Sequence, residues 1–158
     1  MKMRMSQRGK ELLAQWEGIE ANVYKDSAGL PTIGVGHLLT RDELTSGKII
    51  IRGLSVKYAN GLTQQDVIDL LAQDLDVFEE IVNTNVKVDL AQHQFDALVA
   101  FTFNIGGNAF KSSTLLKVLN QGRYGDVPEQ LRRWVFAGGQ KVQGLANRRE
   151  KEIQLWNG

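Results

Sequence analysis

Hydrophobic residues recur at helical spacing through the middle of the chain. Thr63 precedes three polar residues, which is typical of a capped helix start. After it, apolar side chains fall three or four positions apart, at Val67, Leu70, Leu71, Leu75, Phe78 and Val82. The pattern predicts one long helix over residues 63–82.

A shorter helix is predicted near the N-terminus, over residues 6–17. Ser6 is a candidate N-cap and Gly18 a candidate C-terminal stop, so Glu17 falls in the last turn. The apolar side of this helix is formed by Leu12, Leu13 and Trp16.

The segment after this helix has extended character. Residues 21–24 and 30–35 are separated by Asp26-Ser27-Ala28-Gly29, which is turn chemistry, so we expect a small β-hairpin. Residues 40–60 are ambiguous. Three consecutive isoleucines from Ile49 favour a strand, whereas four glycine and asparagine positions indicate loops.

The rest of the chain is predicted to be helical. Asp89 is a candidate cap for a helix reaching Phe103, which is apolar on most sides and therefore expected to be buried. Further helices are predicted over residues 113–121, 127–136 and 145–156. A small hairpin region is thus followed by helices.

Composition narrows the classes of protein. The 158 residues include no cysteine, which excludes disulfides and a thiolate nucleophile. The N-terminus lacks the apolar run of a signal peptide or anchor, and the apolar stretch over 95–105 is too short to span a bilayer. We therefore expect a soluble protein with no membrane insertion.

Charge is segregated along the chain, although the net charge is only +1. Residues 63–100 hold one lysine and eight acids, whereas residues 111–158 hold nine basic residues and four acids. The basic part is compatible with a polyanionic partner. Solvated helix faces that partly pair with each other are the simpler explanation.

Glu17, Asp26 and Thr32 form the candidate catalytic set. Two carboxylates and a positioned water suffice to hydrolyse a glycosidic bond. The carbonyl end of the helix and apolar neighbours such as Trp16 favour a protonated Glu17, which can donate to a leaving sugar oxygen. Taken singly, Glu17 is equally a solvated surface residue, and Asp26 equally a turn residue bonded to its own backbone.

His37 suggests a metal site or a nucleophilic triad, but His93 is the only other histidine and no matching motif occurs. No metal and no cofactor are therefore expected. Asp74 falls on the apolar stripe of the long helix, where a charge needs a partner. We predict that it pairs with His37.

These residues carry a specific resemblance. Tyr24-Lys25-Asp26, Gly29 and the run from Thr32 to Thr40 resemble the signature of the phage-type lysozymes, or endolysins. The similarity continues through Phe103-Asn104-Ile105-Gly106, Ser113-Thr114-Leu115-Leu116, Leu131-Arg132-Arg133-Trp134 and Asn147-Arg148-Arg149-Glu150, and is weakest over 41–61.

The resemblance implies an α+β, lysozyme-like fold in a single catalytic domain. Its parts are a β-containing lobe over about 18–62, a linking helix over about 63–82 and a helical lobe over about 83–158. The helix over 6–17 is expected to pack on the helical lobe.

The resemblance also implies roles. Similar enzymes are muramidases, which cleave the β-1,4 bond between N-acetylmuramic acid and N-acetylglucosamine with inversion. Glu17 corresponds to the general acid, and Asp26 with Thr32 to the pair that positions water. Asn104 is expected to reach the substrate cleft. Arg148 is expected near Glu17, where its charge opposes protonation of the acid.

The implied partner is peptidoglycan, and the implied life cycle is that of an endolysin. We expect a monomer that waits in the host cytoplasm until a holin-type membrane-disrupting protein releases it to the periplasm and cell wall. Two alternatives stay open. One is a non-catalytic module that binds cell-wall glycan. The other is a nucleic-acid binder using Arg132, Arg133, Arg148 and Arg149, but basic C-terminal helices are weak evidence and we expect no nucleic-acid partner.

Overall fold

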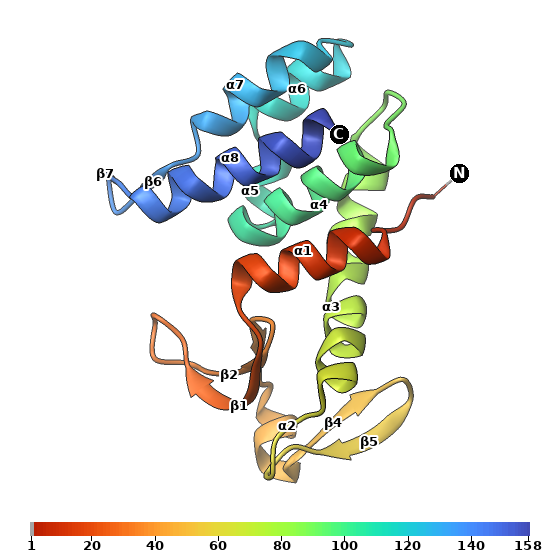
Figure 1. Ribbon diagram of the computed structural model, residues 1–158, viewed down its shortest axis with the longest axis vertical. Helices are drawn as coiled ribbons and strands as arrows, with labels where there is room; N and C mark the ends of the chain where they lie inside the picture. Colours follow the sequence, from red (N-terminus) through yellow and green to blue (C-terminus); the bar gives the residue numbers. More distant parts are fainter. Residues whose placement is uncertain (1) are drawn as a thin grey trace. The chain divides into compact units, whose positions relative to one another are not determined.

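The computed structural model describes residues 2–158, which form two compact units (Figure 1). One unit is Lys10–Asp76, and the other joins the residues up to Gly9 to Val77–Gly158. Both boundaries fall inside helices, the first in α1 (Gln7–Glu17) and the second in α3 (Gln64–Asn85). The expected packing of the first helix on the helical lobe stays a prediction.

The unit Lys10–Asp76 carries the β structure. An antiparallel sheet has the order β1-β2-β3, and a separate hairpin pairs β4 with β5. Its elements, besides the parts of α1 and α3 that it contains, are β1 (Glu20–Lys25), β2 (Pro31–Gly34), β3 (His37–Leu38), α2 (Arg41–Ser46), β4 (Lys48–Ile51) and β5 (Leu54–Lys57).

The other unit is mainly helical. After the C-terminal part of α3 it contains α4 (Gln92–Ile105), α5 (Gly107–Lys111), α6 (Thr114–Asn120), the 3₁₀ turn η1 (Tyr124–Asp126), α7 (Val127–Arg132), β6 (Phe136–Ala137), β7 (Gln140–Lys141) and α8 (Gln143–Asn157). The predicted α+β class is confirmed.

The predicted helix starts are confirmed by their hydrogen bonds. Ser6 Oγ accepts from the Gly9 N–H at 3.0 Å, and Thr63 Oγ1 accepts from the Asp66 N–H at 3.0 Å. Gly18 ends α1 with φ +88° and donates to the Ala14 carbonyl. Capping is decided by neighbouring residues, so the sequence was enough to locate these ends.

In the unit Lys10–Asp76, strand β2 lies directly against α3. A Cβ built on Gly34 would stand 3.7 Å from side-chain atoms of Leu70 and Val67, and Gly34 has φ +68°. Glycine therefore serves both the conformation and the close approach. The buried side chains nearby include Ile33, Val35, Ile49, Ile51, Val67, Leu70 and Leu71.

In the helical unit, α4 is the buried centre. Every residue from Phe95 to Thr102 is buried, as the apolar pattern predicted. Phe101 packs edge-on against Phe110 and Trp134, with ring centroids 6.4 and 5.7 Å away. Such pairs bury large area in a specific geometry.

Several predicted boundaries are wrong. The helix α4 begins at Gln92 rather than at an Asp89 cap, because the Gln94 side chain accepts from the Ala91 N–H at 2.9 Å. The helix predicted to reach residue 136 ends at Arg132.

A short hairpin follows that helix and was not predicted. Gly138 and Gly139, both with positive φ, form the two-residue turn that pairs β6 with β7. The Gly-Gly pair was the available signal.

Within residues 2–158, no helix combines the length and the apolar character needed to cross a membrane.

Asp96 joins the start of α1 to α4 inside the helical unit. This carboxylate is 3% exposed and accepts from the Ser6 N–H, the Ser6 hydroxyl and the Gln92 side chain. Gly9 lies directly on it, because a Cβ there would stand 2.8 Å from Asp96 Cγ.

We predict that Gly9→Ala destabilises the protein. Alanine in a helix gains about 1 kcal/mol over glycine, but displacing a bonded, buried carboxylate costs about 1–3 kcal/mol. Urea unfolding checks the sign. Gly144→Ala in α8 is the matched control, since nothing lies within 4 Å of the added Cβ. Equal stabilisation in both variants would contradict the prediction.

Candidate active site

Asp26 and Thr32 are joined through the backbone of one residue, Leu30. The Asp26 Oδ1 accepts from the Leu30 N–H and from the Ala28 N–H, both at 2.9 Å. The Leu30 carbonyl accepts from the Asp26 N–H and from the Thr32 hydroxyl, both at 2.9 Å. The turn between β1 and β2 therefore holds a carboxylate and a hydroxyl in a defined relation.

Tyr24 relates this turn to the end of α1. It is the Cα partner of Thr32 in the antiparallel ladder, so the two side chains share one face of the sheet. Burial raises the pKa of Tyr24, and the charges of Glu20, Glu17 and Asp26 raise it further. Glu17 and Asp26 thus act on the same phenol.

Glu17 is the last residue of α1 and is half-buried, as is Asp26, whereas Thr32 is buried. All three predicted catalytic residues lie in the unit Lys10–Asp76. The unit therefore contains a carboxylate at the end of α1 and a carboxylate and a hydroxyl in the β1–β2 turn. Such a set can supply a proton donor and a water site.

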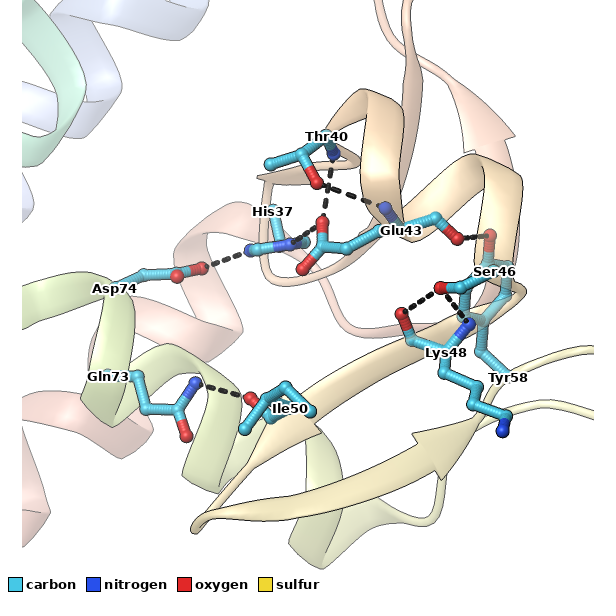
Figure 2. Close-up of polar contacts among 9 residues, drawn as sticks. All are labelled: His37, Thr40, Glu43, Ser46, Lys48, Ile50, Tyr58, Gln73 and Asp74. Atoms are coloured by element: carbon cyan, nitrogen blue, oxygen red, sulfur yellow. Dashed lines mark hydrogen bonds and ion pairs between the residues drawn. The ribbon is translucent and has the colours of Figure 1, made fainter.

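His37 lies between two carboxylates, as Figure 2 shows. Its Nδ1 is 2.8 Å from Asp74 Oδ2, which confirms the pairing predicted from the helical periodicity. Its Nε2 is 2.9 Å from Glu43 Oε1. The imidazole connects β3, α2 and α3 within one unit.

The pKa of His37 is raised to about 9. Burial lowers it, but the hydrogen bonds and charges of Asp74 and Glu43 outweigh burial. Near neutral pH the favoured state is therefore an imidazolium that donates one hydrogen bond from each ring nitrogen, to the carboxylates of Asp74 and Glu43.

Glu43 was missed by the sequence reasoning. Its side chain also accepts from the Thr40 N–H at 2.9 Å, and Thr40 Oγ1 accepts from the Glu43 N–H at 3.1 Å, which makes a capping box for α2 (Figure 2). The Thr-x-x-Glu spacing was a signal for this helix. Nothing local indicated that the same carboxylate also binds His37.

Asn104 and Arg148 belong to the other unit, where they join a buried cluster around Glu152. Arg148 Nε donates to Glu152 at 2.9 Å and its Nη2 donates to the Ala100 carbonyl at 3.1 Å. The Asn104 side-chain oxygen accepts from Arg149. The proposed approach of Arg148 to Glu17 stays a prediction.

Arg149 and Glu152 complete this cluster. Glu152 was not singled out from the sequence, and Arg149 was considered only as part of a family motif and of a basic surface. Arg149 donates to Glu152 and to the Trp134 carbonyl, and its guanidinium lies 5.0 Å from the Phe101 ring centroid. Burial raises the pKa of Glu152, and the two arginines oppose that rise. Their spacing along α8, three and four residues, was the available signal.

No group of three or more His, Asp or Glu residues among residues 2–158 is arranged to hold a metal ion.

Comparisons with known proteins agree on one family. The profile of the family described as Phage lysozyme matches residues 14–152. The Endolysin of Bacillus phage PZA is 37% identical over 160 residues, covering 98% of this chain. Among solved structures, a mutant of P22 lysozyme superposes with a TM-score of 0.83 at 35% identity, covering 99% of both chains.

A further similar structure is the muramidase domain of SpmX from Asticaccaulis excentricus. It has a TM-score of 0.81 at 31% identity and covers 98% of both chains. The chain spans 55% of the length of the Bacillus phage PZA protein.

The stability of the unit Lys10–Asp76 is predicted to fall at alkaline pH. The folded-state pKa of His37, about 9, lies above its ordinary value of 6.5. Protonated His37 therefore contributes fully to the free energy of unfolding below about pH 6.5, and this contribution is lost as the pH rises through about 9. Asp74→Asn should lower the His37 pKa toward its ordinary value and flatten this dependence.

Imidazole titration by NMR and thermal unfolding across pH check both statements. Asp42→Asn is the matched control. Asp42 is exposed in the same unit, and its substitution removes one negative charge, as Asp74→Asn does. An unchanged His37 titration in Asp74→Asn would contradict the assignment.

Proposed function

The chain belongs to the phage lysozyme family, and we propose that it is an endolysin that hydrolyses the β-1,4 bond between N-acetylmuramic acid and N-acetylglucosamine. One observation carries the proposal. The Leu30 backbone binds both the Asp26 carboxylate and the Thr32 hydroxyl, which holds these two groups together in one turn. Glu17 ends the helix that leads into the same sheet and lies in the same unit.

Glu17 is proposed as the general acid. It is the last residue of α1 and is half-buried. A protonated carboxyl there donates to the oxygen that leaves with the departing sugar.

Asp26 and Thr32 are proposed to hold and activate the attacking water. Two backbone N–H groups fix one carboxylate oxygen of Asp26 and leave the other oxygen to accept a proton. The Thr32 hydroxyl adds a ligand for water without adding charge. Attack by this water on the face opposite the acid gives inversion at the anomeric carbon.

Asn104 and Arg148 are proposed to support the site, with Asn104 contacting substrate and Arg148 tuning Glu17. Their contacts to Arg149 and Glu152 keep both side chains in fixed positions within their own unit.

The proposed context is host lysis. Peptidoglycan is the substrate, and the enzyme acts as a monomer. It is held in the host cytoplasm and reaches the wall when a holin-type protein opens the membrane. No cofactor takes part in this scheme.

Glu17→Gln is expected to lower lysis of purified cell walls by about 10²–10⁴-fold, because glutamine keeps the shape of the side chain but cannot act as an acid. Release of reducing ends is the measurement, with circular dichroism to verify the fold. Glu129→Gln, at an exposed position of α7, is the control for a lost carboxylate. Wall binding without release of reducing ends by the native protein would instead indicate a glycan-binding module.

Thr32→Ser and Thr32→Val separate the hydroxyl from the bulk of the side chain. Serine retains the hydroxyl and should keep activity within about tenfold, whereas valine should lose about a hundredfold or more. NMR of the first product should show the inverted anomer for the native enzyme and for Thr32→Ser. A retained anomer, or equal activity of the two variants, would refute the water-site assignment.

A further inference from the structure

The β4–β5 hairpin presents an exposed cationic face. Its register places Lys48 opposite Lys57 and Ile50 opposite Ser55, so these four side chains share one face. All four residues are exposed, and the opposite face holds the buried Ile49 and Ile51.

Two features of this face are unfavourable in water. Like charges directly opposite each other in a ladder repel. In addition, Ile50 on this face is 57% exposed. Leu54 pairs with Ile51 and so lies on the opposite face, next to the turn, where it is 68% exposed. Residues that destabilise a protein locally, with no compensating contact inside it, often belong to a functional site.

The charge of this segment is not balanced along the chain. Residues 47–65 contain Lys48, Arg52 and Lys57 and no acidic residue. Arg52 pairs with Asp69 of α3, whereas Lys48 and Lys57 take part in no ion pair within the described part of the chain. The two lysines therefore provide the excess positive charge.

The hairpin is held firmly enough to act as a surface. The Gln73 side chain of α3 accepts from the Arg52 N–H at 2.9 Å and donates to the Ile50 carbonyl at 3.0 Å (Figure 2 shows the second bond). At the other end, the Tyr58 hydroxyl donates to the Glu43 carbonyl at 2.8 Å.

We propose that the β4–β5 hairpin is a docking surface for an anionic phospholipid bilayer. Lys48 and Lys57 meet the headgroups, which offsets their mutual repulsion. The hairpin enters tip first, so that Ile50 on one face and Leu54 on the other, both close to the turn, reach the interfacial layer. A soluble polyanion would satisfy the lysines but leave these aliphatic groups in water. The combination therefore favours a membrane over a polymer.

The test is co-sedimentation of the full chain with large unilamellar vesicles. We expect binding to vesicles of phosphatidylglycerol and phosphatidylcholine, weakened by salt, and little binding to phosphatidylcholine alone. Lys48→Gln with Lys57→Gln should lower the partition coefficient by about tenfold or more, since each lysine near such a surface contributes about fivefold. Ile50→Ser with Leu54→Ser should lower it several-fold at unchanged net charge.

The matched control is Lys111→Gln with Lys117→Gln, which removes the same charge at exposed positions of α5 and α6. Thermal unfolding verifies that each variant is folded. An equal loss in the control, or no effect of the serine variant, would overturn the proposal. Retention on heparin with no vesicle binding would also overturn it and would indicate a polymer partner. Vesicle binding is read without peptidoglycan, so failure here leaves the proposed hydrolase function intact.

Discussion

A charge that leaves water must find a partner, and this constraint determines much of the internal architecture of both units. In the helical unit, the 4%-exposed Glu79 accepts from the Met5 N–H at 2.6 Å, and Asp96 holds the start of α1 against α4. Glu152, 0% exposed, is bonded by two arginines of its own helix. In the other unit, His37 unites three elements through Asp74 and Glu43. Removing one member of such a pair leaves a buried charge and costs about 3–5 kcal/mol.

The candidate active site follows a different rule. Asp26 is held by backbone N–H groups of its own turn, and Thr32 is bonded to a backbone carbonyl of the same turn. These neutral partners orient the candidate catalytic groups without placing a cation in the described contacts of the carboxylate. The ion pairs of this unit instead connect secondary-structure elements, as His37 does with Asp74 and Glu43.

Local chemistry explains why much of the fold was predictable. Ser6, Thr63 and Ser113 cap helices through bonds to residues three positions away, so their roles are visible in the sequence. The same is true of the turn that follows Asp26. The missed elements were short. Helix α2 depends on a capping box around Glu43, and the β6–β7 hairpin depends on two glycines. Short elements carry too few periodic positions to be recognised by hydrophobic pattern.

The sequence by itself therefore determined the longer helices, the β1–β2 hairpin, the resemblance to the family and the candidate residues Glu17, Asp26 and Thr32. It also indicated the His37–Asp74 pair, because an acid on an apolar stripe needs a partner. Only the tertiary structure decided that Glu43 also binds His37 and that Arg149 binds Asn104. Two adjacent residues of the same type look alike in the sequence, but their side chains leave the helix in different directions. The surrounding packing decides which partner each of them binds. Partner choice among distant side chains depends on that packing, whereas capping and turns depend on the nearest few residues.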